Sequence, residues 1–464
     1  MPVAQFPGER NWGYDGVYPF AVQESYGGPA GLKRLVNAAH ALGLAVVLDV
    51  VYNHLGPEGN YLNEFAPYFT DRYNTPWGWA LNFDGPDSDH VRHYFAENAL
   101  YWQTEFHLDA LRLDAVHAIC DFSATPFLEE LAAITHRQAE TLKRPFYLIA
   151  ESDMNMARHI LPRTLGGYGM DAQWSDDFHH ALHVLLTGEQ QGYYEDFTGL
   201  AQFGKFWREG YTFTGEYSAH RRRRHGSSPQ QLAARQFVFC AQNRDQVGNR
   251  MLGDRLSATL SLEQLKLAAG CVLLSPFIPM LFMGEEYGET APFQYFVSHG
   301  DPDLVEAVRQ GRAREFAAFK WKGEVPDPQA EKTFETCRLN RDLLKQPSHQ
   351  ALLEFHRELI RLRKSLPAIA NAEKETTEVL DDAAENTLCV RYRHEQNEVM
   401  LWFYFGSQPK QIQVPLASGS WRALLDSAAP QWQGPGREVP ETTHSTGQIT
   451  LALAPTSVLL LQKI

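Results

Sequence analysis

Helix-like segments alternate with short, continuously apolar runs along most of this chain. Between residues 31 and 42, for example, Leu32, Leu35 and Val36 recur at helical spacing. The apolar runs that follow the helices are rich in β-branched residues, as is typical of strands buried on both faces of a parallel sheet. Helices are expected at 31–42, 91–106, 125–142 and 262–274, and strands at 44–52, from 108, at 145–151, near 170, at 232–243 and at 277–283. This alternation predicts an α/β fold with a parallel sheet.

Polar side chains follow the C-terminal end of each predicted strand. They include Asp49, Asn53, His54, Asp114, His117, Glu151, Asp153, Asn243, Asp245, Glu285 and Glu286. In a (β/α)8 barrel, active sites are built at this edge. A doubly wound sheet also binds ligands at the carboxyl ends of its strands, but no glycine-rich phosphate-binding motif follows any strand here. The sequence therefore favours a (β/α)8 TIM-type barrel.

The pattern changes beyond about residue 372, after a last helical segment at 349–364. Short alternating runs follow, separated by Gly, Ser and Pro turns, as is typical of antiparallel strands. Strands are expected at 388–393, 399–405, 411–414, 449–453 and 458–462. We therefore predict a catalytic (β/α) barrel with loop insertions over residues 1–371. A small antiparallel β-sandwich domain is predicted over residues 372–464.

Charge and cysteine content limit the possible partners and compartments. The net charge of -14 argues against a nucleic acid or an anionic membrane as the partner, and the one basic cluster, His220–His225, is expected to be a solvated loop. The five cysteines show no zinc-type or redox-type spacing, so we expect free thiols in a reducing compartment. No signal peptide or bilayer-spanning segment is visible. These features predict a cytoplasmic protein.

The stretch Leu108–His117 carries an arginine and an aspartate on one face of an otherwise apolar predicted strand. Side chains two residues apart in a strand point the same way, so Arg112 and Asp114 should be neighbours. Burying both charges costs free energy unless they pair with each other or serve a function. A guanidinium also keeps a nearby carboxylate ionised. Taken alone, the stretch fits a structural ion pair between strands as well as an oriented carboxylate nucleophile.

Two further carboxylates at strand ends favour the catalytic alternative. Glycoside hydrolysis needs one carboxylate as nucleophile or base and one carboxylic acid to protonate the leaving oxygen. Glu151 follows an apolar run, so we expect apolar surroundings to raise its pKa toward the acid role. Asp245 is suited to stabilise positive charge at an anomeric carbon, and His54 and His117 are donors for sugar hydroxyls. Together these residues indicate a glycosidase.

Four segments resemble the signature regions of the α-amylase superfamily of glycoside hydrolases, in their usual order. These segments are Asp49–His54, Leu111–His117, Glu151–Asp153 and Asn243–Asp245. The resemblance implies a retaining double displacement on α-glucosidic bonds. It also implies that Asp114 is the nucleophile, Glu151 the general acid/base and Asp245 the transition-state stabiliser.

The same resemblance implies a set of residues that bind the substrate. They are Tyr14, Asp49, His54, Arg112, His117, Asp153, Arg244 and Gln246. Arg112 is expected to orient the nucleophile, while Tyr14 and His54 contact the sugar on the near side of the cut. No cofactor or metal is demanded. Asn53 matches a position that binds calcium in some amylases, but the other oxygen ligands cannot be assembled from the sequence.

Longer strings resemble the maltooligosyltrehalose trehalohydrolases within this superfamily. The strings are residues 1–8, 12–17, 75–78, 82–84, 171–183, 186–189, 245–250 and 326–329. Such an enzyme cuts the α-1,4 bond next to the terminal trehalose unit of maltooligosyl trehalose. It releases trehalose and acts after a maltooligosyltrehalose synthase in trehalose biosynthesis. The string 171–183 discriminates best, because a general amylase has no reason to keep it. The alternatives are a glucan branching enzyme and a general α-glucanase.

Two departures from the family pattern qualify this interpretation. Arg244 stands where the superfamily usually has histidine, and a bulkier, permanently charged guanidinium could lower the pKa of Asp245 or narrow the site. The string Met1–Gly8 lies at the very start of the chain, whereas in the family it follows further elements. We count six predicted strands, where a closed barrel has eight. The expectation is an N-terminally truncated chain, and an inactive glucan-binding remnant is the alternative from a different class.

Overall fold

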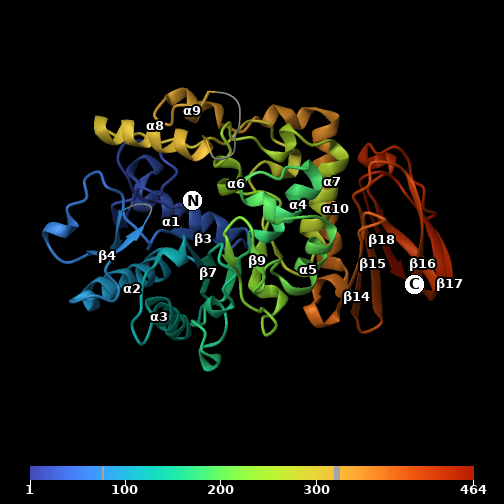
Figure 1. The fold of residues 1–464 in the computed structure, drawn as a ribbon, viewed down its shortest axis with the longest axis horizontal. Helices are drawn as coiled ribbons and strands as arrows, with labels where there is room; N and C mark the ends of the chain where they lie inside the picture. Colours follow the sequence, from blue (N-terminus) through green and yellow to red (C-terminus); the bar gives the residue numbers. More distant parts are fainter. Residues whose placement is uncertain (76–77, 318–323) are drawn as a thin grey trace. The chain divides into compact units, whose positions relative to one another are not determined.

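The computed structural model describes residues 1–75, 78–317 and 324–464, and the chain divides into two compact units (Figure 1). The first unit comprises Met1–Trp174, Tyr295–Glu315 and Val325–Phe334. The second comprises Ser175–Gln294, Phe316–Glu324 and Glu335–Ile464. The predicted motif 75–78 is only partly visible, because residues 76–77 lie outside the described residues.

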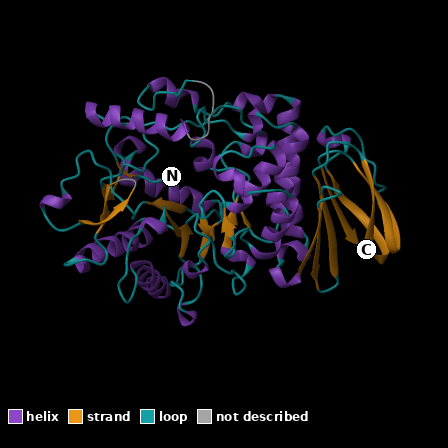
Figure 2. Ribbon diagram, viewed as in Figure 1, coloured by secondary structure: helices purple, strands orange, loops and turns teal. Residues whose placement is uncertain are grey.

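Four parallel strands form the centre of the first unit (Figure 2). They lie side by side in the order β3 (Val47–Val50), β6 (Ala110–Leu113), β7 (Tyr147–Glu151) and β8 (Ala172–Trp174). All four residues of β6 are buried, as expected for an inner strand of a parallel sheet. The strands expected at 44–52, from 108, at 145–151 and near 170 are therefore confirmed, in shorter form.

Helices precede or follow these strands as the periodicity predicted. The helices are α1 (Gly28–Ala41), α2 (Ser88–Glu105) and α3 (Phe127–Leu142). Two antiparallel pairs complete the strands, β1 (Ala4–Gln5) with β2 (Tyr18–Val22) and β4 (Phe69–Thr75) with β5 (Gly78–Leu81). Later in the chain come α8 (Pro302–Ala317) and α9 (Glu331–Thr336), which the sequence analysis did not predict.

The second unit begins with a pair of parallel strands, β11 (Phe237–Phe239) and β12 (Ile278–Pro279). Its helices are α4 (Asp177–Thr187), α5 (Leu200–Glu209), α6 (Arg244–Gly248), α7 (Leu262–Leu273), α10 (Pro347–Ser365) and α11 (Pro367–Ala370). The helices at 262–274 and 349–364 were predicted, whereas α4 and α5 were not. In the basic cluster, His220–Arg222 lie in the turn of an antiparallel hairpin, β9 (Tyr217–Ser218) with β10 (Arg223–Arg224). Arg222–Arg224 are exposed, as expected for a solvated segment, whereas His225 is buried.

The predicted C-terminal antiparallel domain is confirmed as a six-stranded sheet in the order β13-β14-β15-β18-β16-β17. The strands are β13 (Thr377–Asp382), β14 (Thr387–His394), β15 (Asn397–Tyr404), β16 (Lys410–Asp426), β17 (Thr442–Leu453) and β18 (Ser457–Lys463). One face buries Trp402, Trp421 and Leu461 in an apolar core. The domain boundary at residue 371 stays a prediction.

All five cysteines are free thiols in the structure. Cys240, Cys271, Cys337 and Cys389 are buried free thiols, and Cys120 is a free, half-buried one, which confirms that prediction. Within the described residues, no helix combines the length and the apolar character needed to cross a bilayer.

One buried charge joins helix α7 to the C-terminal sheet domain. The side chain of Lys266 is fully buried, and its ammonium group donates hydrogen bonds to the carbonyl oxygens of Ser427 (2.8 Å) and Trp432 (3.0 Å). Burial lowers the pKa of Lys266, while Glu263, 4.0 Å away, acts in the opposite direction. The ammonium group therefore gives two buried carbonyl oxygens a hydrogen-bond donor, which an apolar side chain in its place would not provide.

We predict that Lys266→Met lowers the free energy of unfolding by about 1–3 kcal/mol. Two carbonyls lose their donor, while the relief from burying a charge offsets part of the loss. Urea unfolding followed by circular dichroism measures the difference. Lys345→Met is the matched control, because that side chain is 80% exposed. Equal effects of the two substitutions would contradict the structural role of Lys266.

Candidate active site

Arg112 of strand β6 lies at the centre of three carboxylates. Its Nη1 atom is 2.6 Å from Oδ1 of Asp49 and 2.8 Å from Oδ1 of Asp114, and its Nη2 atom is 3.4 Å from Oε2 of Glu151. The guanidinium is only 3% exposed. One buried cation thus faces three carboxylates, so the cluster (called the Arg112 cluster below) has an excess of negative charge.

The register of the parallel strands explains why these residues meet. Asp49 of β3 pairs with Arg112 of β6, and Leu113 of β6 pairs with Ala150 of β7. Continuing that register by one residue brings Asp114 beside Glu151. Side chains two residues apart share a face of the strand, so the predicted proximity of Arg112 and Asp114 is confirmed.

Trp174, the last residue of β8, covers the guanidinium. Its ring lies 4.3 Å from the central carbon of Arg112, in cation–π geometry. The neighbouring strand brings it there, since Trp174 pairs with Glu151. An aromatic face keeps water from the cation without neutralising it. The ring therefore strengthens the attraction between Arg112 and its carboxylates.

Asp49 is held ionised although it is buried. The phenol of Tyr14 donates a hydrogen bond to Oδ2 of Asp49 (2.6 Å), while Arg112 contacts the other oxygen. Burial by itself would raise the pKa of Asp49, but the charge of Arg112 and the hydrogen bonds outweigh it, so that the pKa is lowered. The position of Tyr14 is thereby fixed through its hydroxyl group.

Asp114 is held at both oxygens. The side-chain amide of Asn53 donates to the backbone carbonyl of Asp114 (2.7 Å) and to its Oδ2 atom (3.0 Å), while Arg112 contacts Oδ1. Asn53 also contacts the ring of His54, whose Nε2 atom lies 2.9 Å from the carbonyl oxygen of Tyr14. Burial lowers the pKa of His54, and the nearby Asp114 only partly opposes this. These contacts fix the orientation of the Asp114 carboxylate.

The surroundings of Glu151 differ from those predicted. The sequence suggested an apolar environment, but Oε2 accepts a hydrogen bond from the backbone N–H of Ala115 and lies near the Arg112 guanidinium. Both contacts are polar, so the predicted apolar environment is wrong. Ala115 adopts a left-handed conformation (φ 41°), which is uncommon for a residue other than glycine.

His117 and Asp153 form a more exposed pair. The Nδ1 atom of His117 lies 4.0 Å from Oδ1 of Asp153, and about a third of each side chain is accessible to solvent. The two residues follow β6 and β7, respectively, and therefore belong to the same strand ends as the Arg112 cluster. Both are accessible to a ligand bound from solvent.

Asp245 is positioned in the second unit by the first turn of α6. The side chain of Asn243 caps this helix by accepting hydrogen bonds from the backbone N–H groups of Asp245 (2.8 Å) and Gln246 (3.0 Å). Oδ1 of Asp245 is 2.7 Å from the Asn249 amide and 3.1 Å from Nη1 of Arg244. The carboxylate is 39% exposed, so it can contact a ligand.

The structure thus brings most predicted site residues into two groups. The first unit assembles Tyr14, Asp49, His54, Arg112, Asp114 and Glu151 by direct contacts, with His117 and Asp153 as a pair at the same strand ends. The second unit holds Arg244, Asp245 and Gln246 on consecutive positions of α6. Within the described ranges, no group of three or more His, Cys, Asp or Glu side chains is arranged to hold a metal ion.

The list of predicted site residues omitted several that the structure shows in contact with them. These are Asn53, Ala115, Trp174, Asp176 and Asn249. All five lie inside strings already noted, since Asn53 belongs to 49–54, Ala115 to 111–117, Trp174 and Asp176 to 171–183 and Asn249 to 245–250. The strings therefore contained these residues, but the sequence did not show which residues of a string contact the predicted site residues.

The fold and a family model identify the class of protein. Residues 1–80 match the family model described as "Alpha amylase, catalytic domain". A solved structure of a Salmonella typhimurium protein, provisionally named an alpha amylase, is similar with a TM-score of 0.86 and 38% sequence identity. The likeness covers 100% of this chain and 75% of that one. The chain therefore has the TIM-type barrel fold of an alpha-amylase catalytic domain, followed by an antiparallel β domain.

Curated relatives narrow the assignment. The chain is 49% identical over 371 residues to malto-oligosyltrehalose trehalohydrolase of Saccharolobus solfataricus, covering 80% of this chain and 63% of that protein. It is 47% identical over 419 residues to the protein of that name from Rhizobium sp. strain M-11, covering 89% and 70%. A 1,4-alpha-glucan branching enzyme of Corynebacterium efficiens shares 24% identity. The chain belongs to the malto-oligosyltrehalose trehalohydrolase family, and it spans 63% of the first relative's length.

We predict that Arg112→Met destabilises the protein by about 3–5 kcal/mol at pH 7.5, because three buried carboxylates lose their cation. Without the guanidinium, the effect of burial, which raises the pKa of Asp49, is no longer opposed by the charge of Arg112, so the folded variant binds protons more readily. Its stability should therefore recover as the pH falls toward 5. In the native chain the pKa of Asp49 is lowered, and its contribution is lost only when the pH falls below about 4.

Urea unfolding at pH 7.5 and at pH 5.5 tests this prediction. Arg72→Met serves as the control, since Arg72 is 57% exposed and should show a small effect at both values. If Arg112→Met lowers the free energy of unfolding by the same amount at both pH values, Arg112 does not act by neutralising the carboxylates.

Proposed function

We propose that this chain carries out the hydrolysis of maltooligosyl trehalose. It cuts the α-1,4-glucosidic bond next to the terminal trehalose unit and releases free trehalose. The observation that carries this proposal is the Arg112 cluster, with three carboxylates at the ends of parallel strands, in a member of the trehalohydrolase family. The family membership supports the choice of substrate, and the carboxylates support the chemistry.

The proposed reaction is a retaining double displacement. An oxygen of Asp114 attacks the anomeric carbon, the bond from that carbon to the glycosidic oxygen breaks, and Glu151 donates a proton to the leaving oxygen. Water then attacks the anomeric carbon, Glu151 accepts its proton, and the bond to Asp114 breaks. The net change is the addition of one water across the glycosidic bond, and Asp114 and Glu151 return to their starting states.

The contacts of Asp114 suit a nucleophile. Arg112 and Asn53 hold the carboxylate at both oxygens, so little orientational freedom is lost when it attacks. In this scheme Arg112 is a positioning residue. With Glu151 protonated as the acid, Asp49 and Asp114 still provide two carboxylates for the one guanidinium of Arg112, and the residual negative charge stabilises the positive charge that develops on the sugar ring. Asp245 adds to this stabilisation from α6.

The remaining predicted residues are proposed to bind the substrate. Tyr14 and His54 present a ring face and a donor to the sugar that is attacked, and Asp49 fixes Tyr14 through its hydroxyl. His117 and Asp153 are accessible for hydroxyls of the leaving sugar, whereas Arg244 and Gln246 flank Asp245. Sugar rings pair a flat apolar face with a rim of hydroxyls, which aromatic and polar side chains together match.

The wider context follows from the substrate. A maltooligosaccharide that ends in trehalose must first be made from one with a free reducing end, so we propose that a maltooligosyltrehalose synthase acts before this protein in trehalose biosynthesis. Buried free thiols support a reducing, cytoplasmic location. No nucleic acid or membrane takes part in this scheme.

We predict that the purified chain releases trehalose from maltotriosyl trehalose much faster than it cuts maltopentaose. Chromatography of the products from separate incubations measures both rates. Glu151→Gln should reduce trehalose release about 100- to 10,000-fold, since the leaving oxygen loses its proton donor. Comparable cutting of both substrates would indicate a general α-glucanase, and branched products a branching enzyme. No release by the folded chain would contradict the proposal.

A second prediction concerns Arg244. Its guanidinium lies 3.1 Å from Asp245 and offsets part of the negative charge offered to the transition state. Arg244→His, which is mostly neutral at pH 8, should raise kcat by about three- to tenfold, equivalent to about 0.7–1.4 kcal/mol. Arg244→Lys, which keeps the charge, should stay within about twofold of the native kcat. A fall in kcat for Arg244→His would show instead that the guanidinium is needed to hold Asp245.

A further inference from the structure

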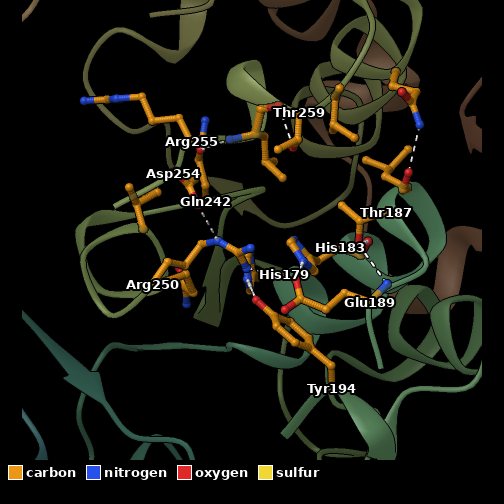
Figure 3. Close-up of a pocket in the computed structure, with 16 residues that line it drawn as sticks. His179, His183, Thr187, Glu189, Tyr194, Gln242, Arg250, Asp254, Arg255 and Thr259 are labelled. Atoms are coloured by element: carbon orange, nitrogen blue, oxygen red, sulfur yellow. Dashed lines mark hydrogen bonds and ion pairs between the residues drawn. The ribbon is translucent and has the colours of Figure 1, made fainter. Parts of the chain in front are cut away.

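A cavity of about 450 Å³ lies in the second unit, beside the turn that carries Asp245 (Figure 3). We call it the α4–α6 pocket. Its walls include His183 and Thr187 of α4, Gln246 of α6, and the later residues Arg250 and Thr259. The volume falls within the range of small-molecule sites, and none of the lining residues has a role in the proposed reaction except Gln246.

The charges in the pocket are balanced. Oε2 of Glu189 accepts from Nε2 of His183 (2.8 Å) and Nη1 of Arg250 (2.9 Å). Burial by itself would raise the pKa of Glu189, but these two partners lower it to about 2. Asp254 lies 4.0 Å from Arg250. The guanidinium of Arg255 donates to the carbonyl oxygens of Ala291 and Met283. Arg250 thus lies between two carboxylates, and neither guanidinium is left to pair bidentately with a phosphate, which favours a neutral ligand over an anion.

The walls combine an aromatic face with polar groups. The rings of His183 and Tyr194 are stacked, with centroids 4.4 Å apart and planes at 16°. Figure 3 shows these two side chains on one side of the cavity and Thr259 on the other. Leu256 contributes an apolar surface. A ligand with an apolar face and a hydroxylated rim, such as a glucosyl ring, matches this mixture.

Two lining residues have a hydrogen-bonding atom with no partner. Nδ1 of His183 and Nη2 of Arg255 are both buried and unsatisfied, and the two side chains are more than nine-tenths buried. Such atoms carry a desolvation cost unless a partner is supplied. Because Nε2 of His183 donates to Glu189, Nδ1 of the neutral ring is an acceptor, and a sugar hydroxyl is a donor that suits it.

The pocket is connected to the proposed chemistry through α6. Gln246 lines the cavity and directly follows Asp245, and its side-chain amide donates to Oδ1 of Asp176 (3.0 Å). A sugar held against Gln246 therefore contacts the same helical turn that positions Asp245. We propose that the α4–α6 pocket binds a glucosyl unit of a neutral oligosaccharide, as a binding site additional to the residues assigned above. The identity of that oligosaccharide rests on the proposed function.

Filling the pocket tests this inference. Thr259 is exposed, and its hydroxyl donates only to the Leu256 carbonyl (3.3 Å), so Thr259→Trp should fold while occupying the cavity. Asp254→Ala is a second, smaller change in the same pocket. Thr442→Trp, at an exposed position of β17, is the matched control. The probes are trehalose and maltotriose, titrated separately by calorimetry into the native chain and each variant in the Glu151→Gln background.

We expect Thr259→Trp to weaken the binding of one of the two sugars by about tenfold or more. Asp254→Ala should weaken the same sugar less, and Thr442→Trp should change neither. The sugar that responds identifies the source of the glucosyl unit, a trehalose end or a glucan chain. Unchanged affinity of Thr259→Trp and Asp254→Ala for both sugars, or no measurable binding of either sugar by the native chain, would overturn the inference.

This readout is separate from that of the proposed function. If maltotriose binding depends on Thr259 while no trehalose is released from maltotriosyl trehalose, the sugar site in the α4–α6 pocket is supported and the proposed activity is wrong. If trehalose is released normally and Thr259→Trp alters neither sugar affinity nor KM, the activity stands and the pocket inference fails.

Discussion

The interaction on which the site depends is the contact of one buried guanidinium with three carboxylates. Arg112 is almost inaccessible to water, and a cation in that position is tolerated only with close counter-charges. The reverse also holds, because Asp49, Asp114 and Glu151 could not lie together at the ends of β3, β6 and β7 without it. The arginine is therefore a condition for gathering the carboxylates, whatever each then does. Its rigid fork reaches two oxygens through Nη1 and a third through Nη2, which an ammonium group could not do.

The residues around Arg112 stabilise the buried charges of the cluster. Trp174 excludes water from one face of Arg112, while Tyr14 and Asn53 supply hydrogen bonds to the carboxylates. Trp174 ends β8 and Asn53 follows β3, so the register of the sheet fixes their distances, whereas Tyr14 lies in a turn before β2. Ala115, whose N–H donates to Glu151, adopts a left-handed backbone conformation, a strained arrangement of the kind found at functional sites. Geometry at the site is thus determined mainly by strand pairing rather than by loop conformation.

The sequence predicted the parallel strands, the C-terminal antiparallel sheet and the Arg112–Asp114 contact, because each depends on a local pattern of two to four residues. It failed for Glu151, whose apolar sequence neighbours point away while a backbone N–H and a guanidinium from β6 point toward it. It also missed α4, in which His179, Ala181 and His183 are buried together and blur the helical period. Contacts made across strands leave no periodic signal in a single chain. Partners such as Trp174 could therefore be noticed in a motif but not assigned to Arg112.

A carboxylate cluster of this kind recognises an anomeric centre, and every α-glucosidic bond presents one. It cannot by itself distinguish a glucan that ends in trehalose from one that does not. Discrimination must come from groups that contact sugar rings further along the substrate. Three of the strings that resemble the trehalohydrolases, 171–183, 186–189 and 245–250, fold as α4, α6 and the segments after them, which line the α4–α6 pocket. Part of the sequence that carries the family likeness therefore surrounds this cavity, whereas Arg112, Asp114 and Glu151 lie at the strand ends of the first unit. Under the proposed function, the cavity is a candidate for substrate choice, and the strand ends together with Asp245 are candidates for bond cleavage.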